Sequence, residues 1–297
     1  MSDTYRSQRR TRSWALFAAV GSVALISACT TAAGGEAADS SPEAHVETDP
    51  PGFNHVHGVA GEAGTDAVLV AAHSGLFRLS EEGDVQIGPG IDLMGFAVAT
   101  PGRFLASGHP GPGVDLPQPV GLIESTDQGN TWQPLSRQGQ SDFHALTVSA
   151  AGILGYDGSL LRSADGKAWE ELEIPAEPAA LSASPDGQQV LATTAQGLLL
   201  SIDAGTSWTP VPGAPLLQLV DWAADGRTAV GVDPSGGVWT SQDAAATWEK
   251  AAQLDAAPQA VDVGAAADGG TRILVVTATA ISESRDGGQT FIDLRRD

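Results

Sequence analysis

The octamer Ser125-Thr126-Asp127-Gln128-Gly129-Asn130-Thr131-Trp132 decides the fold, because the chain returns to it again and again. Ser201–Trp208 and Ser284–Phe291 are further copies, the latter with Phe in place of Trp. Ser163–Trp169 is one residue short, and Ser241–Trp248 has lost its glycine. The copies start roughly 40 residues apart, which is the period of a four-stranded propeller blade.

Each octamer has the chemistry of a tight β-hairpin. An apolar run ends at Ser, the Asp side chain accepts hydrogen bonds from backbone N–H groups of the loop, and Gly supplies a positive φ. An aromatic residue then begins the returning strand. We expect the octamer aspartates to be structural rather than catalytic, namely Asp127, Asp165, Asp203, Asp243 and Asp286.

The pattern Ser-x-Asp-x-Gly-x-Thr-Trp resembles the Asp-box (BNR) repeat of sialidase-like β-propellers, in which the box is a structural hairpin. The resemblance implies an all-β, six-bladed propeller over residues 55–297. We expect its blades to start near His55, Asp92, Gln140, Ala179, Leu216 and Gln259, with a degenerate box at Ser80–Asp84 in the first. The prolines of His109–Pro119 predict a long loop between the second and third strands of blade two.

The N-terminus is typical of an export signal. Arg6, Arg9, Arg10 and Arg12 precede an apolar run from Trp14 to Ile26, which is too short for an ordinary membrane-spanning helix. The segment Leu25–Cys29 resembles a bacterial lipobox, and Cys29 is the only cysteine, so no intramolecular disulfide can form. We therefore expect a lipoprotein signal peptide over residues 1–28 and a lipidated Cys29.

The segment 29–54 is rich in Ala, Gly, Ser, Pro and Glu and predicts a flexible linker. The expected product is a cell-membrane lipoprotein that faces the extracytoplasmic side, whether it is exported by the Sec or the Tat route. A formal net charge of −21 excludes non-specific nucleic-acid binding and leaves cationic ligands and metal ions as partners. A closed propeller has no edge strands to pair, so we expect a monomer.

Strand direction predicts which residues share a face. The innermost strand of each blade starts at one face of the ring, here named the top face, and the second strand ends there. Four histidines fall at such positions, and we predict a metal site that uses them, for copper or zinc: His57, His73, His109 and His144. The alternative is that these imidazoles cap strand ends. Because side chains alternate along a strand, we expect His55 to point away from the ring axis when His57 points toward it.

Other residues of the top face are candidates for ligand binding, namely Met94, Asp157, Gln218 and Gln259. Several segments of the first three blades, among them Asp92–Phe96 and Asp142–Leu146, are similar to a bacterial lipoprotein group known as glycosyl hydrolase-like. That group owes its label to fold similarity, which establishes no reaction.

A sialidase mechanism is excluded by the positions of the arginines, most of which we expect on the opposite face. Another glycoside hydrolase would need two suitably spaced carboxylates. The candidate catalytic residues are Asp115, Asp157 and Tyr156, and Asp92, Asp142, Asp221 and Asp262 are further acidic residues near the top face or on inner strands. Three functions remain open: a ligand-binding propeller that holds a transition metal, a hydrolase of an extracellular glycan, and a protein-assembly platform.

Overall fold

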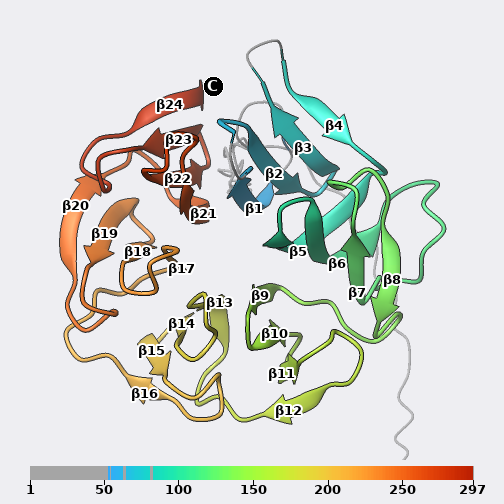
Figure 1. Cartoon of the computed structure of the whole chain (residues 1–297), viewed down its shortest axis with the longest axis horizontal. Helices are drawn as coiled ribbons and strands as arrows, with labels where there is room; N and C mark the ends of the chain where they lie inside the picture. The colour runs from blue at the N-terminus through green and yellow to red at the C-terminus, as the bar shows by residue number, and fades with distance from the viewer. Residues whose placement is uncertain (1–52, 54, 63–64, 81–82, 297) are drawn as a thin grey trace, which may run out of the picture. The chain divides into compact units, whose positions relative to one another are not determined.

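The structure, a computed structural model, describes residue 53 and residues 55–62, 65–80 and 83–296. These residues form six four-stranded sheets, and no helix is found among them. Figure 1 shows the sheets as blades in a ring, with the first strand of each blade innermost. The prediction of an all-β, six-bladed propeller is confirmed.

The strands follow in chain order, four to a blade. Their bounds are β1 (Val56–Gly61), β2 (Val68–Ala72), β3 (Gly75–Leu79), β4 (Val85–Ile87), β5 (Ile91–Thr100), β6 (Arg103–Pro110), β7 (Leu122–Ser125), β8 (Gln133–Ser136), β9 (Ala145–Ser149), β10 (Gly152–Tyr156), β11 (Leu160–Ser163), β12 (Glu170–Leu172), β13 (Pro178–Ala183), β14 (Val190–Thr194), β15 (Gly197–Ser201), β16 (Thr209–Pro210), β17 (Leu219–Trp222), β18 (Ala229–Val232), β19 (Gly237–Ser241), β20 (Glu249–Gln253), β21 (Pro258–Ala265), β22 (Thr271–Thr277), β23 (Ala280–Ser284) and β24 (Ile292–Arg296).

Five of the six blade starts lie close to the expected positions, and blade three is the exception. Its first strand begins at Ala145 rather than near Gln140. The backbone N–H groups of Gln140 and Ser141 donate to the carbonyl of Arg137, which has a positive φ of 63°. This turn uses the residues that were expected to start the strand.

The octamers form the hairpins between the third and fourth strands of their blades. In blade four, Asp203 accepts hydrogen bonds from the backbone N–H of Ser207 at 2.8 Å and from its hydroxyl at 2.6 Å. The N–H of Gly205 donates to Ser201 Oγ at 2.8 Å. These bonds, led by the one from the Ser207 hydroxyl, lower the pKa of Asp203 to about 2. The hairpin loop is therefore held by the ionised carboxylate of Asp203, which accepts hydrogen bonds from the loop.

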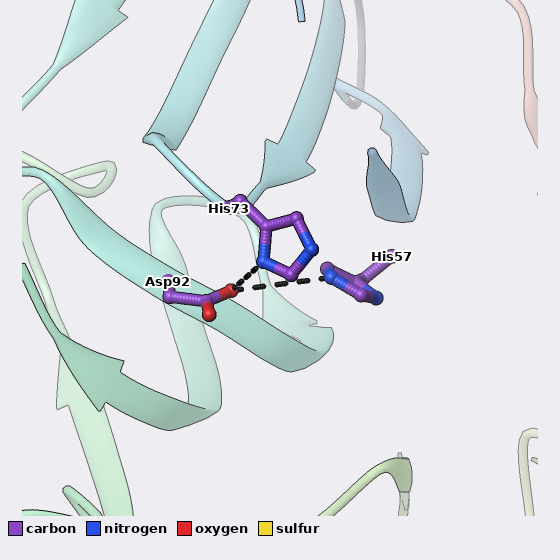
Figure 2. Close-up of side chains that lie close together, drawn as sticks. All are labelled: His57, His73 and Asp92. Atoms are coloured by element: carbon purple, nitrogen blue, oxygen red, sulfur yellow. Dashed lines mark hydrogen bonds and ion pairs between the residues drawn. The ribbon is translucent and has the colours of Figure 1, made fainter. Parts of the chain in front are cut away.

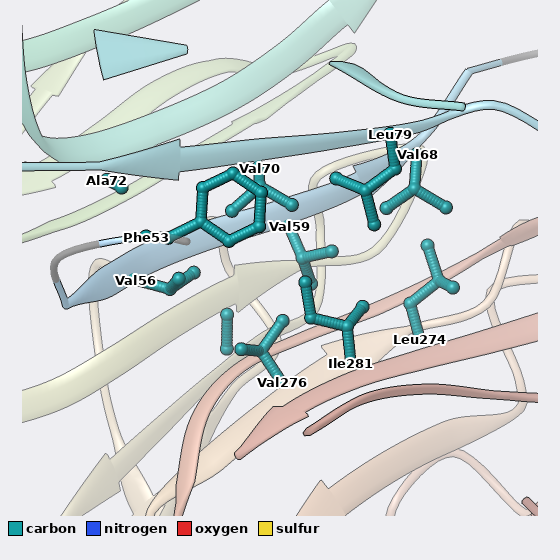
Figure 3. Close-up of a cluster of buried hydrophobic side chains, with 11 residues drawn as sticks. Phe53, Val56, Val59, Val68, Val70, Ala72, Leu79, Leu274, Val276 and Ile281 are labelled. Carbon is teal, nitrogen blue, oxygen red and sulfur yellow. The ribbon is translucent and has the colours of Figure 1, made fainter. Parts of the chain in front are cut away.

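Adjacent blades pack through buried apolar clusters, and the ring is closed in the same way. Figure 3 shows the cluster between blades six and one, in which Leu274, Val276 and Ile281 face Val56 and Val59. Each sheet consists of consecutive strands, so no strand is exchanged between blades at the closure. The last strand also contacts blade one: Arg295 Nη2 of β24 lies 2.9 Å from Asp84 Oδ1.

The long loop of blade two lies between β6 and β7, as the prolines predicted. Phe53, which the sequence placed in the linker, is buried in the closure cluster with its ring centroid 4.9 Å from that of Phe77. The expected signal peptide, Cys29 and the rest of the linker lie outside the described residues. In the part of the chain that the structure covers, no helix is long and apolar enough to cross a membrane.

Candidate functional site

The innermost strands of all six blades surround a cavity of about 380 Å³. Its lining includes His57, Met94, His144 and Gln259, four of the residues predicted to lie on the top face. Met94 stands at a β-bulge, because the pairing of β5 with β6 shifts between Leu93 and Gly95, and bulges re-aim side chains. The cavity thus brings residues from blades one, two, three and six to one space.

His57, His73 and Asp92 form a compact group that is named here the first cluster (Figure 2). His57 lies in β1, His73 directly follows β2, and Asp92 belongs to β5 of the next blade. His73 Nδ1 lies 2.8 Å from Asp92 Oδ1, and His57 Nε2 lies 3.9 Å from the same oxygen. One ligand atom from each residue lies within 4.8 Å of the others, a spacing at which one metal ion can bind all three.

The His57 imidazole is the most buried member of the first cluster, with a side chain 12% exposed. Its Nε2 atom is buried without a hydrogen-bond partner among the described residues, although buried polar atoms are normally paired. Burial, followed by the charges of the nearby His73, His55 and His144, lowers the pKa of His57 to about 3. The ring is therefore neutral at neutral pH, which is the form that binds metals.

His55 lies beside the first cluster but is not among the residues that line the central cavity, so its expected direction away from the ring axis stays a prediction. Its ring centroid lies 4.8 Å from that of His57 and 5.5 Å from that of His73. Side-chain alternation does not apply, because His55 precedes β1 and has a positive φ of 34°. Three imidazoles therefore gather beside Asp92.

The other two predicted ligands, His109 and His144, lie one blade further on in a second cluster with Asp142. His109 Nε2 lies 3.1 Å from Asp142 Oδ2, and His144 Nε2 lies 2.8 Å from the same oxygen. The structure thus brings the four predicted histidines together as two pairs, each pair around one carboxylate.

The predicted ligand-binding glutamines connect neighbouring blades. Gln218 Nε2 donates to the carbonyl of Pro258 at 3.2 Å, and Gln259 Oε1 accepts from the backbone N–H of Val56 at 3.1 Å. Both amides are engaged in contacts that hold inner strands side by side. These contacts give the two glutamines a structural role.

The three candidate catalytic residues do not form a common group. Asp115 is exposed on the long loop of blade two. Asp157 is paired with Arg137, whose Nη2 lies 3.4 Å from Asp157 Oδ2. Tyr156 packs against the apolar cluster between blades three and four.

Two buried carboxylates, Asp221 and Asp262, line the cavity on the side of blades five and six. Asp221 accepts from Ser182 Oγ at 2.7 Å and from the N–H of Val263 at 2.8 Å, and Asp262 accepts from the N–H of Gly61 at 3.0 Å. Burial raises the pKa of Asp221 to about 6. Burial, together with the charge of Asp221, raises the pKa of Asp262 to about 7.

Asp92 and Asp142 were considered only as catalytic acids, and their place among the histidines was missed. A positional indication was present, because each precedes by two residues a predicted top-face residue of an inner strand, Met94 or His144. In a chain with 36 acidic residues, residue type alone did not distinguish them.

Neither a protein-family model nor a curated protein matches the chain. Among solved structures, it is similar to a GH74 enzyme of Niastella koreensis (17% identity, TM-score 0.59, covering 82% of this chain and 38% of that one). A chain of a nidogen/laminin complex is 13% identical with a TM-score of 0.61, covering 76% of this chain and 92% of that one. A gluconolactonase of Xanthomonas campestris is 13% identical with a TM-score of 0.59, covering 78% and 85%. At these identities the similarity establishes the propeller fold and no reaction.

Proposed function

We propose that the chain is an exported lipoprotein of the cell membrane whose propeller binds a transition metal ion, copper or zinc, at His57, His73 and Asp92. The observation that carries the proposal is the convergence of two imidazoles and one carboxylate from two blades within 4.8 Å. Zinc and copper both favour imidazole, and three protein ligands leave a position open for water or a ligand.

The surroundings of the cluster support metal binding over simple capping of strand ends. A capping histidine needs one hydrogen-bond partner, which Asp92 supplies to His73 at 2.8 Å. The Nε2 atom of His57 has no such bond among the described residues, although it is buried and faces the same carboxylate oxygen. A metal ion between His57 Nε2 and Asp92 Oδ1 would give both atoms a partner. The hydrophobic surroundings of such a site limit the access of water to the ion.

The test is metal binding by the full chain, purified in detergent and titrated with Zn²⁺ or Cu²⁺. Replacing a ligand removes a coordinate bond. Loss of a residue that only hydrogen-bonds to a ligand already weakens metal affinity by about tenfold or more, so we expect a larger loss for His57→Ala and for His73→Ala. Asp92→Asn keeps the shape and a hydrogen bond but removes the charge, and we expect a similar loss.

His45→Ala is the matched control, because His45 is the one histidine outside the predicted propeller. Its metal affinity should equal that of the wild-type chain. Unchanged affinity together with an unchanged number of bound ions in a folded His57→Ala/His73→Ala double variant would show that the first cluster is not a metal site.

Membrane attachment is the second part of the proposal and rests on the sequence around Cys29. A single acyl chain gives marginal binding, whereas the two or more chains of a diacylglyceryl anchor hold a protein firmly. We expect Cys29→Ser to move the protein from the membrane fraction to the soluble fraction of expressing cells. A variant that stays in the membrane fraction would refute lipid attachment at Cys29.

A further inference from the structure

The second cluster, His109, Asp142 and His144, repeats the chemistry of the first cluster at the junction of blades two and three. Its two histidine nitrogens lie 3.1 and 2.8 Å from the same oxygen, Asp142 Oδ2. The other oxygen of Asp142 and the Nδ1 atom of His109 are both buried and lack a hydrogen-bond partner in the described part of the chain. The cluster is therefore charged, partly desolvated and incompletely satisfied, as an empty cation site would be.

The propeller repeat relates the two clusters position by position. Asp92 and Asp142 each precede by two residues the top-face residue of an inner strand. His73 directly follows the second strand of blade one, and His109 lies near the end of the second strand of blade two. His109 therefore contacts Asp142 at the junction of blades two and three from a position equivalent to that of His73, which contacts Asp92 at the junction of blades one and two.

The repeat ends at the following junction. The corresponding position at the end of the second strand in blade three is occupied by Tyr156 and Asp157, and Asp157 is paired with Arg137. An arginine at this place supplies the positive charge that a metal ion would supply at the two preceding junctions.

In the second cluster each histidine has a nitrogen close to Asp142 Oδ2, at 3.1 Å for His109 and 2.8 Å for His144. Ligand atoms at about 2.0–2.2 Å from a tetrahedral ion lie about 3.3 Å apart, so both distances to Asp142 suit binding of one ion. Among the described residues, however, only the first cluster has all its ligand atoms within 4.8 Å of one another, so the two histidines must move closer together to bind an ion with Asp142. The His144 side chain is 63% exposed and can adjust to coordinate. Met94 lines the same cavity as His57 and His144, and its thioether is a ligand that copper favours.

We propose that His109, Asp142 and His144 form a second transition-metal site, so that the propeller holds two metal ions in adjacent blades. The inference rests on the proposed function for the class of ion. Asp92 of the first cluster and His109 of the second are paired across β5 and β6, where Cα atoms lie about 5 Å apart. Because this pairing places the two clusters side by side, we expect two bound Cu²⁺ ions to interact magnetically.

The experiment compares three variants of the full chain in detergent with the wild type. They are His57→Ala/His73→Ala, His109→Ala/His144→Ala and the quadruple variant that combines them. Each is incubated with Cu²⁺ and desalted, and bound copper is counted. We expect two equivalents in the wild type, one in each double variant and none in the quadruple variant. Dipolar broadening of the Cu²⁺ electron paramagnetic resonance spectrum should be present in the wild type alone.

The outcomes separate this inference from the proposed function. One equivalent in the wild type that only the His57→Ala/His73→Ala change removes would overturn the second site and leave the first intact. One equivalent that only the His109→Ala/His144→Ala change removes would support the second site and overturn the first. Loss of all copper from either folded double variant would show one shared site and overturn the inference.

Far-UV circular dichroism of each variant establishes that the propeller is folded. If His109→Ala/His144→Ala does not fold, Asp142→Asn replaces it, because the amide keeps the size of the carboxylate and a hydrogen-bond acceptor for one histidine. We expect this variant to bind one equivalent of copper. Two equivalents in a folded Asp142→Asn variant would count against the second site.

Discussion

At the scale of single residues, Asp221 and Asp262 differ from ordinary acidic side chains in the pKa of their carboxyl groups. Both are buried in the cavity wall, and burial raises the pKa of each, to about 6 and about 7. Each accepts a backbone hydrogen bond across a blade junction: Asp221 of blade five from Val263 of blade six, and Asp262 of blade six from Gly61 of blade one. The two carboxylates thus join inner strands, and one of them carries a proton under mildly acidic conditions.

This pair contributes stability to the metal-free protein that is lost as the pH rises, whereas His57, whose pKa is lowered to about 3, contributes stability that is gained as the pH rises to 6.5. A raised pKa in the folded state means that the folded protein binds more protons than the unfolded chain. The stabilisation is complete below the unfolded pKa, near 4, and is lost as the pH rises through about 6 and 7. Each carboxylate should lower the free energy of unfolding by up to about 1.4 kcal/mol per pH unit. The effect is measured as the difference between the wild type and Asp262→Asn in urea unfolding between pH 5 and pH 8, in which the His57 contribution cancels.

Asp262→Asn imitates the protonated acid and removes the charge that acts on Asp221, so its stability should depend less on pH than that of the wild type. The matched control is Asp268→Asn, in the exposed turn that follows β21, which should keep the wild-type pH dependence. If Asp262→Asn keeps that dependence in full, Asp262 does not have a raised pKa in the folded protein.

At the scale of the structural element, the octamer hairpins account for the success of the fold prediction. The hydrogen bonds made by their Ser and Asp side chains join residues at most four apart, as between Asp203 and Ser207, so the octamer itself contains these partners. The same holds for Ser241–Trp248, where Ala245 takes the place of the glycine and still adopts a positive φ of 64°. A local motif that repeats with the period of a blade therefore fixes both the strand order and the blade number.

The candidate site depends on contacts that the sequence does not contain. His73 and Asp92 are 19 residues apart and belong to different blades, and their approach is set by the packing of those blades. Residue type pointed to the scarce histidines, and strand direction placed them on one face. Neither property divided them into two clusters or selected Asp92 and Asp142 among the many acidic residues. The contact of His55 with the rings of His57 and His73 was not predicted, because a positive φ before β1 has no sequence pattern here.

At the scale of the whole propeller, closure depends on side-chain packing, because the sheets of blades six and one share no strand. Ile281 of β23 is fully buried in the closure cluster, with Val68 and Val70 of blade one in the same cluster (Figure 3). In a ring of units that contact only their neighbours, loss of one junction converts the ring into an open array. The closure cluster should therefore stabilise every blade and not only the two that it joins.

We expect Ile281→Ala to lower the free energy of unfolding by about 2–5 kcal/mol, as deletion of buried methyl groups does elsewhere. The same substitution at Ile202, whose side chain is 71% exposed, should change it by less than about 0.5 kcal/mol. The propeller tryptophans, which run from Trp132 to Trp248, lie in blades two to five. Tryptophan fluorescence thus reports on these four blades, whereas far-UV circular dichroism reports on all six.

If closure couples the whole ring, the fluorescence and dichroism transitions of Ile281→Ala in urea will coincide, at a lower midpoint than in the wild type. The reason is that an opened junction exposes apolar surface on both sides, and the remaining blades unfold with it. If blades one and six instead separate from a stable remainder, the dichroism signal will begin to fall at a lower urea concentration than the fluorescence signal. That divergence would show that the four tryptophan-bearing blades hold together without closure, and that the ring is stabilised one junction at a time.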